Sequence, residues 1–276
     1  MTAAVGKDTA GNGDAASAGT GRRIRRRTDR MMLKENERLD SLLKHNRKII
    51  QNEQEFCFSL DAVLLSNFPA MGPKMRVLDL GTGTGVMPLI VCDKVKSVTG
   101  VEISPKMADM ARRSVELNGL GDRITIIEGD YRRIEGLVGR ESFDLVLSNP
   151  PYRPVGQGEL NNLTGVARAR HEVTATLRDT VRAARYALRF HGRLVMVHLP
   201  ERLGEIIVAL HENQLEIKRL QFVQPKAEKA PNMMLLEAVC GAAPGGLRVL
   251  PPLIVHQDGG GYTPEVLRFY EEEENE

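Results

Sequence analysis

The sequence predicts an α/β protein with a doubly wound, mostly parallel seven-stranded sheet that ends in an antiparallel hairpin. Three observations support this fold class. Short β-branched runs alternate with helical patterns through the middle of the 276-residue chain. These runs are nearly continuously apolar, as in strands that are covered on both faces. Near the C-terminus two more strand-like runs follow each other with only a loop between them, which predicts the hairpin.

Each expected element has a local signature. A short helix from Leu60 to about Asn67 follows Ser59, a residue typical of an N-cap. A later helix follows Ser104, with Pro105 at its first position, and stops at Asn118-Gly119. In chain order, the expected strands are residues 77–80, 97–101, 124–127, 145–147, 194–198, 214–224 and 233–240.

The two ends of the chain differ in composition from its middle. Residues 1–35 contain few large apolar groups, and we expect a disordered arm. We expect residues 36–270 to form one domain and residues 271–276 a frayed acidic tail. The arm is either a phosphate-binding segment or a solvated tail, and its basic run consists of Arg22, Arg23, Arg25, Arg26, Arg27 and Arg30.

The overall composition excludes several classes of protein. The 38 basic and 36 acidic residues nearly balance, so net charge favours neither presence nor absence of a polyanionic partner. No run approaches the ~18 apolar residues of a membrane span, and no signal peptide is expected. Cys57, Cys92 and Cys240 form no closely spaced pair, so we expect neither a disulfide nor a metal site, and a reducing, cytoplasmic setting.

The first expected strand runs into the sequence Asp79-Leu80-Gly81-Thr82-Gly83-Thr84-Gly85. Glycines permit tight turns and let a ligand approach the main chain closely. Alone, this pattern is also compatible with a plain turn. Its place between a buried strand and a helix favours a ligand-binding loop, because open α/β sheets bind ligands at the carboxyl ends of their strands.

Acidic residues end the next two expected strands. Glu102 lies 23 residues after Asp79, at about the spacing where dinucleotide-binding folds use a carboxylate to hold a ribose. Asp130, after the third strand, could accept a hydrogen bond from an adenine amino group, or could simply cap a helix. The glycine spacing does not match the pyrophosphate-binding pattern, so a dinucleotide oxidoreductase is a remote alternative.

The fourth expected strand ends in Asn149-Pro150-Pro151-Tyr152. A rigid turn is one interpretation, but the position beside the expected cofactor loop favours catalysis. The side-chain oxygen of Asn149 and the carbonyl of Pro150 could accept both N–H groups of a planar amine, which returns electron density to its nitrogen. The prolines stiffen the loop, and Tyr152 could stack on a base, an interaction of ~1–3 kcal/mol.

Together these segments resemble the seven-stranded, Rossmann-like S-adenosylmethionine-dependent methyltransferases, over roughly residues 76–240. The resemblance implies that the three loop glycines line the methionine part of the cofactor, with Asp79 near its amino group. It also implies that Glu102 holds the ribose and Asp130 the adenine. The further cofactor-binding residues that we expect are Thr82, Ile103 and Tyr131. Enzymes of this class that methylate exocyclic amines or amides carry Asn-Pro-Pro-Tyr at the same place.

Segments outside these motifs are similar to one bacterial family, the tRNA-valine adenine-N6 methyltransferases, which act beside the anticodon. The similarity covers about residues 33–270, although its N-terminal arm departs from the usual pattern. It implies N6 methylation of an adenine in RNA. The segments that carry it are residues 49–51, 56–65, 169–172, 251–255 and 261–263.

Other interpretations remain open from sequence alone. DNA adenine methyltransferases usually need a separate recognition domain, for which this chain has no room. Glutamine methylation of a release factor uses the same tetrapeptide and is the first alternative, although those enzymes usually carry a helical N-terminal domain. A non-catalytic cofactor-binding or RNA-binding module is the second. We expect tRNA as partner, with no membrane and no metal.

Candidate RNA contacts come from basic and mobile-looking segments. Arg178, Arg182, Arg185 and Arg189 recur at helical spacing beside an apolar stripe (Leu177, Val181, Ala184 and Leu188), and an ordinary solvated helix face is the favoured interpretation. Lys226 and Lys229 are possible phosphate contacts. His171 fits a structural role better than a catalytic one. A loop over the base would contain Arg153, Pro154, Gly156 and Gly158, followed by Arg168 and Arg170.

Overall fold

The computed structural model describes residues 33–42, 47–52, 59–150, 152 and 175–270. The chain divides into two units, Met1–Lys34 and Glu35–Glu276, and every element below belongs to the second. Residues 1–32, which contain all six arginines of the expected arm's basic run, and the acidic tail lie outside the described residues. Of the described helices, none has the length and apolar character needed to cross a bilayer.

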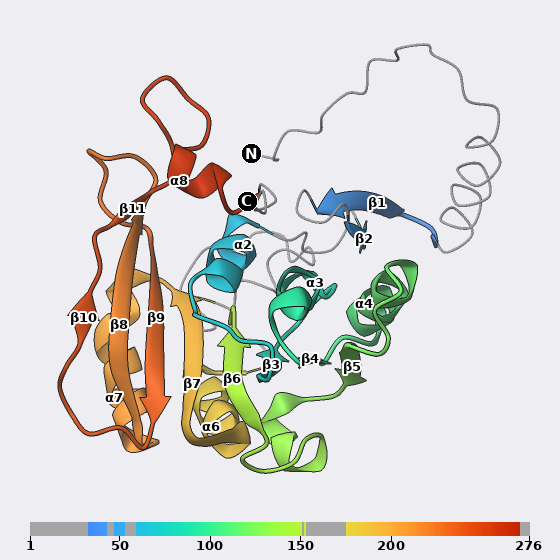
Figure 1. Ribbon diagram of the computed structural model, residues 1–276, viewed down its shortest axis with the longest axis horizontal. Coiled ribbons are helices and arrows are strands. Elements are labelled where there is room, and N and C mark those ends of the chain that lie inside the picture. Colours follow the sequence, from blue (N-terminus) through green and yellow to red (C-terminus); the bar gives the residue numbers. More distant parts are fainter. Residues whose placement is uncertain (1–32, 43–46, 53–58, 151, 153–174, 271–276) are drawn as a thin grey trace, which may run out of the picture. The chain divides into compact units, whose positions relative to one another are not determined.

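The core of the fold is one sheet whose strands lie in the order β10-β8-β9-β7-β6-β3-β4-β5, with β11 paired to β8 (Figure 1). Strands β7, β6, β3, β4 and β5 are parallel, and β9 is antiparallel to both β7 and β8. This confirms the predicted fold class. The bounds are β3 (Arg76–Leu80), β4 (Ser97–Glu102), β5 (Ile124–Glu128), β6 (Phe143–Ser148), β7 (Leu188–His198), β8 (Leu215–Gln224), β9 (Met233–Cys240), β10 (Arg248–Val249) and β11 (Leu253–Ile254).

The order of the strands creates a switch point between β3 and β6. From β3 the chain continues outward through β4 and β5, and it then returns to the other side of β3 to form β6 and β7. At the carboxyl edge Leu80 of β3 pairs with both Ser148 of β6 and Val101 of β4. In open α/β sheets the crevice for a ligand lies at such a switch point.

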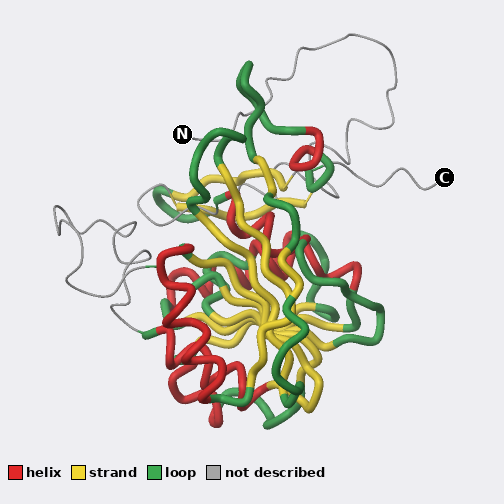
Figure 2. The backbone as a smooth tube through the Cα atoms, turned by 90° about the vertical axis from the view of Figure 1, so that its left-hand side faces the viewer, coloured by secondary structure: helices red, strands yellow, loops and turns green. Residues whose placement is uncertain are grey.

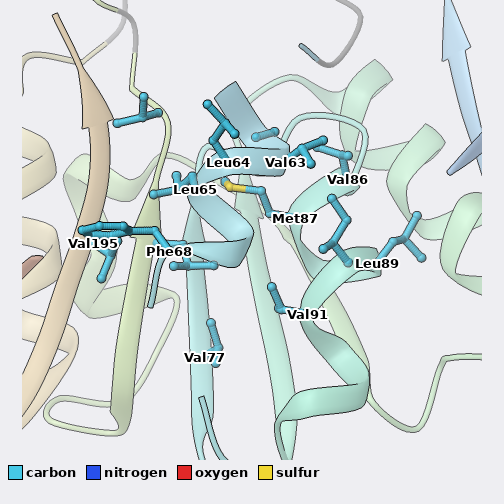
Figure 3. Close-up of a cluster of buried hydrophobic side chains, with 14 of the residues drawn as sticks. Val63, Leu64, Leu65, Phe68, Val77, Val86, Met87, Leu89, Val91 and Val195 are labelled. Atoms are coloured by element: carbon cyan, nitrogen blue, oxygen red, sulfur yellow. The ribbon is translucent and has the colours of Figure 1, made fainter. Parts of the chain in front are cut away.

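Helices cover both faces of the sheet (Figures 1 and 2). One face carries α2 (Leu60–Asn67), α3 (Val86–Val91) and α4 (Pro105–Leu117). The other carries α6 (Leu177–Ala187), α7 (Leu203–Glu212) and the short helix η3 (Tyr131–Gly136). Each face has its own buried apolar cluster. Figure 3 shows part of the first cluster, where apolar side chains of α2 and α3 lie on the same side of the sheet as Val77 of β3 and Val195 of β7.

Sequence signals for the helix ends have mixed outcomes. The Ser104 hydroxyl accepts a hydrogen bond from the Met107 amide at 3.4 Å, and Gly119 after the end of α4 has a φ of +64°, as expected for a cap and a stop. Ser59 occupies the N-cap position of α2, but its hydroxyl makes no capping bond. The backbone at Ser59 is extended, as is usual for an N-cap residue.

The expected arginine stripe is interrupted by the end of a helix. Leu177, Val181 and Ala184 are buried along α6, as predicted. The helix ends at Ala187, however, and Leu188 and Arg189 already belong to β7. The prediction that Arg189 continues the helical stripe was therefore wrong. The spacing misled because the strand follows the helix without a loop.

An N-terminal hairpin of β1 (Glu37–Leu42) and β2 (Arg47–Asn52) was not expected from the sequence. Its outer edge is covered by side chains of α4 instead of another strand. The Asn118 side chain accepts from the Lys48 amide at 3.0 Å and donates to the Lys48 carbonyl at 2.6 Å. The Ser114 hydroxyl accepts from the Ile50 amide at 2.9 Å. These bonds satisfy backbone groups that would otherwise form an open sheet edge.

Candidate cofactor and substrate site

Four segments singled out in the sequence lie along one edge of the sheet. They follow the carboxyl ends of β6, β3, β4 and β5, which are neighbours in this order. The row therefore runs from Asn149 through the glycine loop (residues 81–85) and Glu102 to Asp130. Adjacent strands are ~4.8 Å apart, so three spacings span roughly 14 Å. The structure thus brings together the segments that the sequence assigns to cofactor and target.

The glycine loop turns sharply at the end of β3. Gly81, Gly83 and Gly85 have φ values of +76°, +58° and +88°, which residues other than glycine rarely adopt. The amides of Gly81 and Thr82 both donate to the Val101 carbonyl, at 2.9 and 3.0 Å. A Cβ atom at Gly85 would lie 3.3 Å from the Ala111 side chain of α4. The positive φ values at these glycines make the turn possible. The missing side chain at Gly85 also lets the start of α3 pack closely against α4.

Asp79 is completely buried beneath this loop. Its Oδ2 accepts a hydrogen bond from the Thr82 hydroxyl at 2.6 Å. Its Oδ1 has no hydrogen-bond partner within the described part of the chain. Burial raises the pKa of Asp79 to about 7, against the opposing effect of the Thr82 bond and with a further contribution from Glu102. A buried acceptor without a donor is costly, and here it marks a place for a donor or a cation.

Glu102 is held by backbone amides on both of its oxygens. Oε2 accepts from Gly83 at 2.8 Å and Oε1 accepts from Ser104 at 2.9 Å. Burial raises the pKa of Glu102, and the amide bonds partly offset this effect. Each carboxylate oxygen keeps a second lone pair, so the group is fixed and can still accept two hydroxyls. Beside it, Ile103 leaves 40% of its surface exposed as an apolar patch.

Asp130 has a different environment. It caps η3, where its side chain accepts from the Arg132 amide at 2.9 Å, and it forms an ion pair with the Arg132 guanidinium at 2.6 Å. The bonds to Arg132 lower the pKa of Asp130. The capping interpretation is therefore what the structure shows. Next to it, Tyr131 is buried, and its hydroxyl lies 3.1 Å from the Thr180 hydroxyl.

Asn149 and Tyr152 contact each other directly at the end of β6. The Tyr152 hydroxyl lies 2.7 Å from Asn149 Oδ1 and also bonds to the Asp61 carboxylate of α2. Pro150, the next residue after Asn149, is buried. Pro151 lies outside the described residues. The sequence predicts only a stacking role for Tyr152. Its contact with Asp61 was missed, although Asp61 lies in the run of residues 56–65 that carries part of the family resemblance.

His198 is a second residue that the sequence did not assign to the site. It is buried at the end of β7, and its ring meets the Tyr152 ring edge-on at 5.6 Å. Nδ1 accepts from the Leu199 amide at 2.8 Å, which leaves the hydrogen of the neutral ring on Nε2. Burial lowers the pKa of His198 to about 4, with a further contribution from Arg202. The ring is therefore neutral at physiological pH.

The candidate RNA contacts are only partly described. Within the arginine stripe every side chain has a partner in this chain: Arg178 pairs with Glu212, Arg182 with Asp179, Arg185 with Glu141 and Arg189 with Asp144. This favours the interpretation as an ordinary surface. Arg153, Pro154, Gly156, Gly158, Arg168, residues 169–172 and Cys57 lie outside the described residues. Over the part of the chain that the structure describes, no group of three His, Cys, Asp or Glu side chains could hold a metal ion.

The residues of this edge fit S-adenosylmethionine. The unpartnered oxygen of buried Asp79 suits an ammonium group, and the fixed carboxylate of Glu102 suits a pair of ribose hydroxyls. Between them, Gly81 of the glycine loop is exposed and Gly83 is half-buried. The row is also long enough for an extended molecule that carries an amino acid at one end and a base at the other.

Comparison with known proteins adds to this picture. A family model described as a methyltransferase domain matches residues 77–173. A protein of Porphyromonas gingivalis named tRNA1(Val) (adenine(37)-N6)-methyltransferase is 31% identical over 76% of this chain and 86% of its own length. A protein of Tolumonas auensis with the same name is 30% identical over 64% and 73%. The crystal structure of a predicted O-methyltransferase from Agrobacterium tumefaciens superposes with a TM-score of 0.62 at 27% identity, over 76% of this chain and 95% of that one.

Proposed function

We propose, from the premise that the chain belongs to the tRNA1(Val) (adenine(37)-N6)-methyltransferase family, that it methylates N6 of the adenine at position 37 of a valine tRNA. The chain is an S-adenosylmethionine-dependent methyltransferase. The observation that carries the proposal is the pairing of Leu80 with Ser148, because it sets the glycine loop beside Asn149. The catalytic unit in this proposal is residues 36–270, acting in the cytoplasm where tRNA is modified.

The cofactor would be held by residues of β3, β4 and β5. Asp79 Oδ1 would accept from the ammonium group, and the glycine loop would pass along the methionine part. Glu102 would accept both ribose hydroxyls, with Ile103 and Tyr131 as apolar neighbours of the adenine. Asp130, which is already bound to Arg132, would make a weaker contact with the adenine amino group.

The methyl acceptor would be held by the segment after β6. The N6 lone pair is delocalised into the ring, so the amine is a poor nucleophile. Asn149 Oδ1 and the Pro150 carbonyl would accept hydrogen bonds from its two N–H groups and so raise the electron density on nitrogen as the new bond forms. S-adenosylmethionine would supply an electrophilic methyl carbon on a sulfonium. As the bond from N6 to this carbon forms, the carbon–sulfur bond would break to leave a neutral thioether, and N6 would release one proton to water. The protein's main contribution is to align donor and acceptor, which requires the base to leave its stack.

The direct test is transfer of label from S-adenosylmethionine to a valine tRNA transcript, compared with a transcript that carries guanine at position 37. We expect label only in the first, recovered as N6-methyladenosine by nucleoside mass spectrometry. A parallel reaction with a translation release factor tests glutamine methylation. Label in the release factor and none in tRNA would overturn the proposal.

A matched variant tests the assigned chemistry. Asn149→Ala removes one of the two acceptors while the cofactor residues remain, so we expect turnover to fall by about 1,000-fold or more. The affinity for S-adenosylhomocysteine should stay within about twofold, because Asn149 makes its contact with the other substrate. Normal turnover in this variant would contradict the polarisation mechanism.

A further inference from the structure

We propose that Asp61 is a positioning residue that acts through the Tyr152 hydroxyl to keep Asn149 Oδ1 available for the target amine. This inference rests on the proposed function, since it concerns the same acceptor oxygen. Asp61 belongs to α2, a helix that precedes the cofactor loop in sequence, and the proposal assigns its carboxylate a role in the reaction.

The three groups form a continuous hydrogen-bonded line. The Tyr152 hydroxyl bonds to the Asp61 carboxylate on one side and lies 2.7 Å from Asn149 Oδ1 on the other. Tyr152 is itself held in place, because Arg202 donates to its carbonyl at 3.1 Å and the His198 ring lies against its ring. The hydroxyl therefore has a fixed position between two acceptors.

One hydroxyl has one hydrogen to donate, and the two acceptors compete for it. If the hydrogen points to Asn149, that oxygen already accepts one bond and is a weaker acceptor for the amine. A charged acceptor forms a hydrogen bond roughly twice as strong as a neutral one. The Asp61 carboxylate therefore draws the shared hydrogen toward itself, which weakens the bond to Asn149 Oδ1 and leaves that oxygen a better acceptor for the target N–H.

The surroundings of Asp61 favour a carboxylate that is free for this role. It lies in the first turn of α2, where the helix dipole favours negative charge. Of the described residues, none forms an ion pair with Asp61. The Asp61 charge also reaches Tyr270, whose pKa is raised by burial and Tyr262, with a smaller contribution from Asp61.

A double-mutant cycle tests the inference. Asp61→Asn keeps the shape of the side chain, but its amide can donate to the Tyr152 oxygen and turn the hydroxyl hydrogen toward Asn149. We expect kcat on tRNA to fall by about 10- to 100-fold, with S-adenosylhomocysteine affinity and Tm nearly unchanged. In a Tyr152→Phe background the same Asp61→Asn change should alter kcat by less than about threefold, because the connecting hydroxyl is gone.

The control is Asn67→Ala, at the other end of α2, where the side chain donates to the Val63 carbonyl at 2.9 Å. We expect its kcat to match that of the wild type. If Asp61→Asn lowered kcat equally in both backgrounds, or if Asn67→Ala lowered kcat as much as Asp61→Asn, the positioning role of Asp61 would be overturned. The proposed function would remain intact. Absence of wild-type transfer to tRNA would instead overturn the proposed function and this inference together.

Discussion

The β3–β4 corner of the sheet edge and the β5 corner both present acids after a strand, yet the two corners treat charge in opposite ways. Asp79 and Glu102 are buried and hold their carboxylates in a nearly closed environment that raises both pKa values. Asp130 is bound to Arg132, its pKa is lowered, and its side chain is 24% exposed. The first corner is organised around charges that the protein does not neutralise.

The difference separates binding from structure among residues that look alike in sequence. A carboxylate that is buried without a cation lowers the stability of the folded protein. Such a group is typical of a site where a ligand donates hydrogen bonds or supplies the opposite charge. A carboxylate that caps a helix and pairs with arginine is already satisfied. We therefore expect the energy of cofactor binding to be concentrated at β3 and β4.

The largest effect should come from Glu102→Ala. The change removes the proposed acceptor of two ribose hydroxyls and frees the amides of Gly83 and Ser104, so S-adenosylhomocysteine affinity should fall by about 100- to 1,000-fold. Isothermal titration calorimetry would measure it. Glu128→Ala is the control, because Glu128 pairs with Glu102 in the strand register but points an exposed side chain toward Arg112. If both variants lost S-adenosylhomocysteine affinity to a similar extent, the buried Glu102 carboxylate would have no special role in cofactor binding.

Asp79→Asn should show a pH-dependent gain in stability. A buried carboxyl whose pKa is raised to about 7 binds its proton more tightly when folded than when unfolded, so the wild type loses stability as pH rises from about 4 to 7. Asparagine carries no charge. In the absence of cofactor, the variant should match the wild type near pH 4.5 and exceed it by roughly 2–3 kcal/mol at about pH 8.

Chemical denaturation at both pH values would measure this difference. Asp258→Asn, in an exposed loop, provides the control and should change the stability at neither pH. A stability gain of Asp79→Asn that is the same at both pH values would show that the buried charge is not its cause. S-adenosylhomocysteine should stabilise the wild type more than the variant, because only the wild type offers a carboxylate to the ammonium group.

The smallest effect should come from Asp130→Ala. Loss of the cap on η3 should lower the free energy of unfolding by about 1 kcal/mol, and cofactor affinity should fall by less than about fivefold. Thermal melting and calorimetry on the same sample would separate the two quantities. A loss of affinity as large as that of Glu102→Ala would mean that the adenine contact outweighs the cap, and the two corners would then be equivalent.

The predictable parts of this molecule are those with a short-range cause. The buried strands, the cap at Ser104, the glycine loop and the position of Asn149 all follow from residues close together in sequence. The hairpin β1–β2 was missed because its edge is satisfied by side chains of α4 about 70 residues away. Asp61 was missed for the same reason, since 91 residues separate it from Tyr152. Arg189 was misplaced because a helical spacing continues by chance into a strand.

The switch point between β3 and β6 has a consequence for how such enzymes diversify. In the proposed function, the donor would be held by loops that follow β3, β4 and β5, whereas the acceptor would be held by the segment that follows β6, with support from α2. Changes in the second set can redirect chemistry to a new nucleophile without disturbing the first. A relative named as a predicted O-methyltransferase shares this sheet with a TM-score of 0.62. A grafted segment after β6 would therefore be the most economical route to a changed methyl acceptor.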